Sequence, residues 1–136
     1  MNALNLVNDM DDLNKQLLDI ELAKRQKKLL DGLIMQLQKD FNDVGIQLDL
    51  SNLPQAIYDD LKSRLMPIIK ELMEKHPEKF FILLYRIDIP EQVTKQIFAQ
   101  DSSFSRAEKF TEMILERELK KVIIKYYFSN KEGFKS

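Results

Sequence analysis

Apolar side chains recur along the first third of the chain at spacings of three and four residues, the period of a helix with one buried face. One such run contains Leu13 and Leu17, and a second contains Leu37 and Phe41. The polar stretch between them, residues 24–28, holds neither glycine nor proline, so nothing in it indicates a turn. The pattern therefore predicts one long helix over residues 9–43, part of which we expect to project from a compact domain.

Prolines mark the boundaries of the next element, because proline lacks the amide hydrogen that the interior of a helix uses. Pro54 suits the first turn of a helix. An apolar stripe then continues in phase across Pro67 as far as the residues before His76 and Pro77. We therefore expect one helix over residues 54–75, kinked at Pro67.

The run from Phe80 to Ile87 is the most ambiguous part of the pattern, because a short apolar run fits a buried strand and a buried helix equally well. Pro77 and Glu78 are typical of a helix start, and no other segment alternates clearly enough to pair with a strand here. A helix over residues 78–87 is preferred. Since the run has no polar face, we expect this element to be central.

Two pairs of residues have the spacing of a capping box, in which each side chain accepts an amide hydrogen at a helix start. They are Asp88 with Glu91 and Ser105 with Glu108. The pairs predict a short helix over residues 90–100 and a long one over residues 106–128. The stretch from Val122 to Phe128 is β-branched and aromatic, so it would also suit a strand, and this alternative stays open.

These elements together predict an all-α fold. The chain contains only 3 glycines, too few for the tight turns that join β-hairpins. We expect a single helical domain over residues 1–136, a bundle of about five helices in which the first and last are long. Residues 1–8 and 129–136 are expected to be frayed termini.

Composition narrows the classes of protein. Hydrophobic residues make up 44% and charged residues 32%, which favours a water-soluble globule over a disordered chain or a membrane protein. With 21 Lys and Arg against 22 Asp and Glu, no overall field favours nucleic acid. The chain has no cysteine, so the cytoplasm is the expected compartment. Neither a signal peptide nor a membrane span is predicted.

No catalytic motif is found, and we expect no enzyme, cofactor, metal or small-molecule ligand. The scattered glycines cannot build a phosphate-binding loop, and adjacent acidic pairs point to different sides of a helix. His76 is the only histidine, which excludes a multi-histidine metal site, and it is interpreted as a helix-end cap. A magnesium site would need no signature spacing, so that possibility stays open.

Two groups of residues are candidates for an interaction surface. One is basic, formed by Lys24, Arg25, Lys27 and Lys28, and the other is aromatic, formed by Tyr126, Tyr127 and Phe128. Three consecutive aromatic residues on a helix need neighbours on nearly every side, and a second copy of the chain could supply them. Arg86 and Asp88 are a third candidate, interpreted as a structural polar pair because an arginine next to an apolar run needs a partner.

The resulting functional hypothesis is a non-enzymatic protein–protein interaction or scaffolding module that self-associates as a homodimer. The first alternative is a nucleic-acid-associated accessory protein that uses the basic group Lys24 to Lys28, although nucleic acid is not the expected partner. The second is a small-ligand or enzymatic pocket between helices. The sequence names neither the partner nor the biological process.

Overall fold

The computed structural model describes residues 20–50, 58–99 and 102–133. After a short helical stretch at residues 20–23, its helices are α2 (Lys27–Asp43), α3 (Tyr58–Lys75), α4 (Pro77–Arg86), α5 (Glu91–Phe98) and α6 (Ser103–Gly133). No strand occurs within these ranges, so the all-α prediction is confirmed. The two stretches that could have been strands, residues 80–87 and 122–128, lie almost wholly in α4 and wholly in α6.

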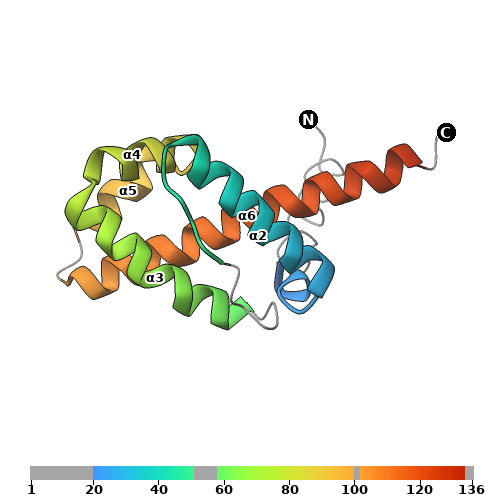
Figure 1. Ribbon diagram of the computed structural model, residues 1–136, viewed down its shortest axis with the longest axis horizontal. Helices are drawn as coiled ribbons and strands as arrows, with labels where there is room; N and C mark the ends of the chain where they lie inside the picture. The colour runs from blue at the N-terminus through green and yellow to red at the C-terminus, as the bar shows by residue number, and fades with distance from the viewer. Residues whose placement is uncertain (1–19, 51–57, 100–101, 134–136) are drawn as a thin grey trace, which may run out of the picture.

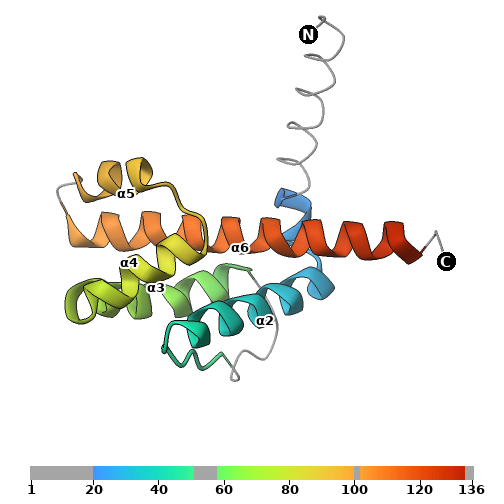
Figure 2. The same cartoon turned by 90° about the horizontal axis from the view of Figure 1, so that it is seen from above.

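α6 is the axis of the bundle (Figures 1 and 2). α2 and α3 pack against it, α4 follows directly from α3, and α5 packs near the beginning of α6. The carboxyl-terminal end of α6 extends beyond the other helices in both views. Among the described residues, the projecting element is therefore the last helix; the expected projection of the first helix involves residues 9–19, which lie outside the described ranges.

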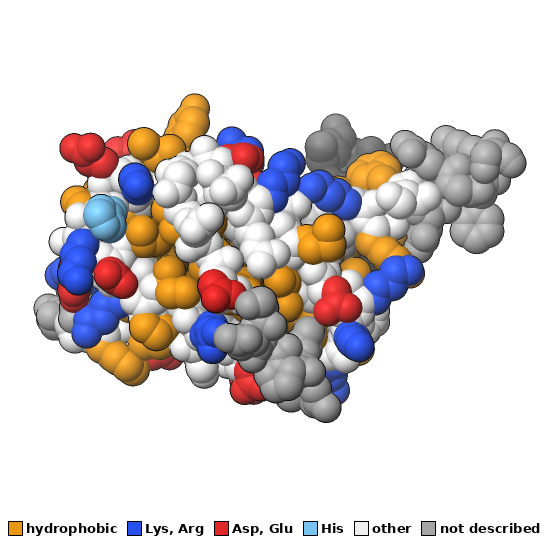
Figure 3. All heavy atoms as spheres, viewed as in Figure 1, with side chains coloured by type: hydrophobic (Ala, Val, Ile, Leu, Met, Phe, Trp, Pro, Cys, Tyr) orange, Lys and Arg blue, Asp and Glu red, His pale blue; other side chains and the backbone are white. Residues whose placement is uncertain are grey.

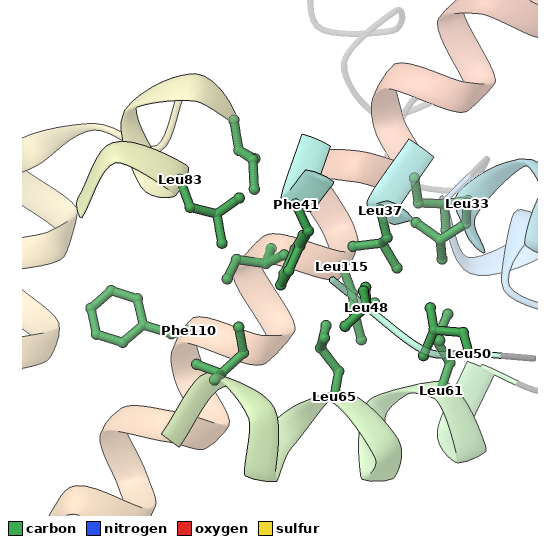
Figure 4. Packing of buried hydrophobic residues seen from close by; sticks show 14 of the residues in the cluster. Leu33, Leu37, Phe41, Leu48, Leu50, Leu61, Leu65, Leu83, Phe110 and Leu115 are labelled. Atoms are coloured by element: carbon green, nitrogen blue, oxygen red, sulfur yellow. The ribbon is translucent and has the colours of Figure 1, made fainter. Parts of the chain in front are cut away.

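The core lies where α2, α3 and α4 meet α6 (Figure 4). Its apolar residues recur every three or four positions on each helix, as a helix with one buried face requires. Phe80 of α4 meets Phe110 of α6 edge to face, with ring centroids 5.0 Å apart, an arrangement that aromatic pairs prefer. The largest fully buried side chains are Phe41, Phe80, Phe110, Leu33, Leu37, Leu61, Leu65, Ile69, Leu83, Ile87, Ile114 and Leu115.

The prediction of one helix through residues 9–43 is wrong, although residues 9–19 lie outside the described ranges. The chain turns at residues 24–26, and Gln26 has extended backbone angles (φ −102°, ψ 116°) before α2 begins. The amide of Arg25 bonds to the carbonyl of Leu22, three residues back, which tightens the end of the preceding turn. This turn lets Ala23 be buried against the core. Tertiary packing outweighs the helical preference of the polar stretch.

The second helix has the predicted continuity and end over the part that the structure describes, and the kink at Pro67 stays a prediction. α3 ends at Lys75, as expected, and passes through Pro67 as one element. Pro67 and Ser63, whose carbonyl loses its helical partner, are both exposed to solvent, so water can bond to that carbonyl. Residues 54–57, the predicted start, lie outside the described residues.

α2 ends in a left-handed turn at Gly45, which has φ +80°. The amide of Ile46 bonds to the carbonyl of Phe41 at 2.9 Å, and that of Gly45 to Asn42 at 3.0 Å, the two bonds of a Schellman motif. Residues 46–50 then run extended across the bundle (Figure 1) with Ile46, Leu48 and Leu50 buried and the residues between them exposed. The sequence analysis missed this segment, although its strict alternation was a readable signal.

The predicted capping boxes are both wrong. Asp88 has φ +68° and terminates α4, with the amide of Ile89 bonded to the carbonyl of Leu84 at 3.0 Å. It occupies the left-handed position that Gly45 occupies after α2, and Asp tolerates that conformation better than most residues. Pro90 is the residue before α5, with no side-chain cap.

The start of α6 lies earlier than predicted. The cap is Ser102, whose Oγ accepts the amide hydrogen of Ser105 at 3.1 Å, so Ser105 is already inside the helix. The side chain of Ser102 thus satisfies a backbone amide that has no partner within the first turn of the helix. α6 also continues to Gly133, beyond the predicted helix end at residue 128; the expected fraying of the terminus stays a prediction, and residues 134–136 lie outside the described ranges.

α4 is not the central element that its apolar run suggested. Phe80, Leu83 and Leu84 are buried, but Phe81, Ile82 and Tyr85 are exposed, Tyr85 by 84%. The helix lies at one end of the bundle (Figure 2), where only one of its faces meets other helices. The apolar run predicts burial of the whole helix, but the fold buries only one face of α4.

Candidate interaction surface

The structure brings the two groups of the predicted interaction surface together. Lys28 near the start of α2 lies over the ring of Tyr126 on α6, with Nζ 4.8 Å from the ring centroid. A cation over an aromatic face is attracted by the ring's electron density. Residues almost one hundred positions apart in the sequence thus share one face of the molecule.

A groove of about 600 Å³ runs between α2 and α6 on this face. Its apolar lining comes from Leu29, Met35, Val122 and Tyr126, and the helices can approach closely because α2 has a glycine there. An added Cβ on Gly32 would lie 2.8 Å from a methyl group of Val122. We call this surface the α2–α6 groove; it is lined by Lys28, Leu29, Gly32, Met35, Gln36, Lys39, Val122, Lys125, Tyr126 and Ser129.

The charged residues of the α2–α6 groove are all lysines. Lys28, Lys39 and Lys125 line it, and blue Lys and Arg side chains lie among apolar ones over α2 and the end of α6 in Figure 3. Arg25 and Lys27 are exposed nearby. Lys24 is turned elsewhere, to Glu21 at 3.1 Å and Glu116 at 3.5 Å. The rim of the groove is therefore positively charged, and Lys24 is not part of it.

Beside the groove, the end of α6 exposes its aromatic residues. The exposed fractions are 39% for Tyr126, 62% for Tyr127 and 55% for Phe128. The rings of Tyr127 and Phe128 stand edge to face, with centroids 6.5 Å apart. Met35 on α2 is 71% exposed and Ile124 on α6 is 46% exposed. Several large apolar side chains exposed in one region of the surface mark a candidate site for another molecule to cover.

A polar network begins at the groove and continues into the bundle. Lys125 donates a hydrogen bond to Gln36 Oε1 at 2.6 Å, and Gln36 Nε2 donates to Asp40 Oδ2 at 3.0 Å. Lys121 lies 3.6 Å from the same carboxylate oxygen of Asp40. Asp40 is only 3% exposed, so each of these contacts stabilises a buried charge.

The network ends at Glu118, which is 0% exposed. Within the described part of the chain, no donor group bonds to either of its carboxyl oxygens, and the nearest cation, Lys121, is 3.9 Å away. Burial, followed by its interaction with Asp40, raises the pKa of Glu118 to about 9. A protonated Glu118 that donates to Asp40 satisfies both groups, because two close carboxylates cannot easily both ionise.

Asp40 takes the charged role in this pair. Burial alone would raise its pKa, but hydrogen bonds with Glu118 and Gln36 and the charges of Lys121 and Arg86 lower the pKa below its ordinary value. The pair therefore shares one proton, held by Glu118. Both residues are shielded from solvent, so this acid pair lies inside the bundle and not on its surface.

Arg86 and Asp88, predicted as a polar pair, each have a different partner. Arg86 donates to Asp43 and lies 3.5 Å from Asp40, so it ties α4 to α2. Asp88 lies 3.8 Å from Arg117 of α6, which also donates to the carbonyl of Ile87 at 3.2 Å. The left-handed turn at Asp88 directs its side chain toward α6. Each residue therefore pairs with a residue of another helix and not with the other member of the predicted pair.

A second groove, of about 560 Å³, lies between α4 and α5 at the opposite end of the bundle. Its lining is mainly apolar, with Phe81, Tyr85 and Phe98 as its aromatic residues. Glu91 and Lys95 lie on its rim and pair with each other at 3.7 Å. Thr94, which also lines the groove, donates its hydroxyl hydrogen to the carbonyl of Pro90 at 3.4 Å. What the groove mainly offers a ligand is therefore apolar surface.

Other candidate sites receive little support from the described residues. No group of histidine, cysteine and carboxylate side chains there could hold a metal ion. His76, the residue before α4, is exposed and its side chain makes no capping bond to that helix. None of the helices in the described ranges is long and apolar enough to cross a bilayer. Searches found no matching family model, curated protein or solved structure.

Proposed function

We propose that this protein is a non-enzymatic interaction module that self-associates through the α2–α6 groove and the aromatic end of α6. The observation that carries the proposal is the exposure of Tyr127 and Phe128, 62% and 55%, on a helix that projects beyond the bundle. Leaving such side chains in water is unfavourable by about 25 cal/mol per Å² of apolar surface. A second copy of the chain would remove them from water.

The chemistry of this face supports a protein partner. Tyrosine, phenylalanine and methionine are enriched at the centre of protein interfaces, and Tyr126, Phe128 and Met35 occur here together. The lysines of the groove form a polar rim around them. An apolar centre with a charged rim is the usual composition of a protein interface.

The proposal is tested by light scattering coupled to size exclusion, with the full chain at tens of micromolar. We expect a dimer, and we expect the double variant Tyr127→Ser/Phe128→Ser to be a monomer with an unchanged circular dichroism spectrum. Tyr85→Ser is the matched control, because Tyr85 is equally aromatic and 84% exposed but belongs to α4 and lines the other groove. A monomeric wild type, or equal loss of the dimer in both variants, contradicts the proposal.

A nucleic-acid-associated role is the second candidate, and one observation favours it. The structure places the aromatic ring of Tyr126 beside Lys28, and Lys39 and Lys125 line the same groove, whereas the sequence shows no aromatic residue within the basic group. Base stacking next to cations is how proteins bind single strands. Filter binding at low salt tests this role, because affinity based on phosphate contacts must fall steeply as salt rises.

A further inference from the structure

We infer that the α2–α6 groove binds residues 1–19 of a second copy of this chain. This inference rests on the proposed self-association and specifies what enters the groove. Each copy has one groove and one such segment. Reciprocal exchange therefore closes as a two-fold dimer, in which both copies use the same surface.

The groove is chemically suited to an acidic segment with an apolar side. Leu29, Met35 and Val122 offer apolar contact, and every charged residue that lines the groove is a lysine. Lys39 is exposed, and Lys28 holds its position over Tyr126 at 4.8 Å. A ligand with carboxylates along its edge would meet complementary charge without displacing a groove residue.

Residues 1–19 have this composition. Their charged residues are Asp9, Asp11, Asp12 and Asp19 against one lysine, Lys15. The apolar residues Met10, Leu13 and Leu17 follow one another at spacings of three and four, so a helix would place them on one face. This is the pattern of a helix that lays an apolar side into a groove while its charges meet the rim.

The entry of the chain into the bundle favours a second copy over the same molecule. Lys24, just before α2, lies over the ring of Tyr58 at 4.8 Å and pairs with Glu116 at 3.5 Å. Neither Tyr58 nor Glu116 lines the α2–α6 groove. The residues just before α2 therefore make their contacts outside the groove of their own chain. In the proposed dimer, the groove takes residues 1–19 of the other copy.

Charge reversal in the full chain tests the inference. The segment variant is Asp9→Lys/Asp11→Lys/Asp12→Lys, the groove variant is Lys28→Glu/Lys39→Glu, and a third variant combines both sets. Light scattering and sedimentation should show at least a tenfold weaker dimer for each single set and recovery of the wild-type dimer in the combination. Lys70→Glu on α3 is the control, since Lys70 is exposed and lies outside the groove. Raising the salt concentration should weaken the wild-type dimer, because exposed charge pairs are screened.

The outcomes separate the inference from the proposed function. A wild-type chain that is monomeric at every concentration overturns both. If Tyr127→Ser/Phe128→Ser disrupts the dimer and neither charge-reversal set weakens it, the inference is overturned and the proposed function stands. Weakening by both sets without recovery in the combination also overturns it, because the two sets of charges would then act independently.

Discussion

The two ends of α6 have similar hydrophobic content and opposite surroundings. From Ala107 to Val122, the apolar positions face α2, α3 and α4 and are buried. From Ile124 to Phe128, the aromatic and aliphatic positions are exposed, because among the described helices this part of α6 meets α2 on one face, and α6 then extends beyond the other helices (Figure 2). The difference teaches that hydrophobicity along one helix shows which side chains require burial, whereas the length of the neighbouring helices decides whether this chain alone provides it.

Truncating one ring at each end should give the largest contrast. Phe110→Ala removes a fully buried ring that contacts Phe80 and should lower the free energy of unfolding by about 3–5 kcal/mol. Tyr127→Ala should change it by less than about 0.5 kcal/mol. Urea denaturation at a protein concentration too low for self-association measures both. Equal destabilisation would show that the end of α6 is covered within one chain.

The buried end of α6 should also give stability a pH dependence. The pKa of Glu118 is raised from 4.5 to about 9, so between these values the folded chain binds one proton more than the unfolded chain. The free energy of unfolding should therefore fall as pH rises across this window, by about 1.4 kcal/mol per pH unit for one proton. Asp40 acts in the opposite direction. Because its pKa is lowered, its ionised form stabilises the fold at any pH above the ordinary pKa of an aspartate, and this contribution is lost as the pH falls and Asp40 is protonated.

Glu118→Gln isolates this effect. The amide cannot ionise and can still donate to Asp40, so the variant should be more stable than the wild type at pH 8–9 and show a flatter profile. Denaturant unfolding at several pH values measures the slope. Glu74→Gln, at an exposed position on α3, is the control. A wild-type profile that rises with pH from 5 to 9 would contradict a shared proton at Glu118.

The boundary between the two ends lies near Val122, where α2 approaches α6 closely at Gly32. Gly32→Ala improves helix propensity by up to about 1 kcal/mol, but its Cβ would lie 2.8 Å from Val122 Cγ1. Because valine has one strongly preferred rotamer in a helix, we expect a net loss of about 1–2 kcal/mol. The double variant Gly32→Ala/Val122→Ala should relieve the contact, and calorimetry compares the two. A stabilised single variant would mean that the helices separate without loss.

The smallest change in stability is expected at the turn after α4, where Asp88 pairs with Arg117 of α6. Asp88 has φ +68°, so Asp88→Gly relieves backbone strain while losing an exposed ion pair with Arg117 that contributes little. We expect stabilisation of about 0.5 kcal/mol or less. Asp88→Ala keeps the strain and loses the pair, so it should be the less stable of the two. The reverse order in thermal unfolding would show that the ion pair outweighs the backbone.

The helices could be predicted from the sequence because their signals are local. The stripe through Leu61 and Leu65 is readable within a few turns, and so is the agreement across Pro67. The turn at residues 24–26 could not be predicted, since it depends on the burial of Ala23 and on Glu116 far along the chain. Asp88 misled for a similar reason, because an aspartate can begin a helix or end one.

The candidate surface was predictable only in pieces. The basic and aromatic groups are visible in the sequence, but the contact of Lys28 with Tyr126 requires α2 and α6 to be packed. Glu118 could have been found, because it falls between Leu115 and Val122 on the apolar stripe of its helix. A carboxyl group on a buried face needs a partner. Its partner, Asp40, comes from another helix.

The proton on Glu118 also changes the charge of the whole molecule. The formal net charge of −1 at pH 7 counts every carboxyl group as ionised. With Glu118 protonated, as a pKa of about 9 requires at pH 7, the formal count rises by one unit, from −1 to 0. A folded protein with no net charge has little long-range electrostatic repulsion between its copies. The buried acid pair therefore removes one unit of like charge from each molecule, a small long-range effect that acts at a distance from the surface on which two copies would meet.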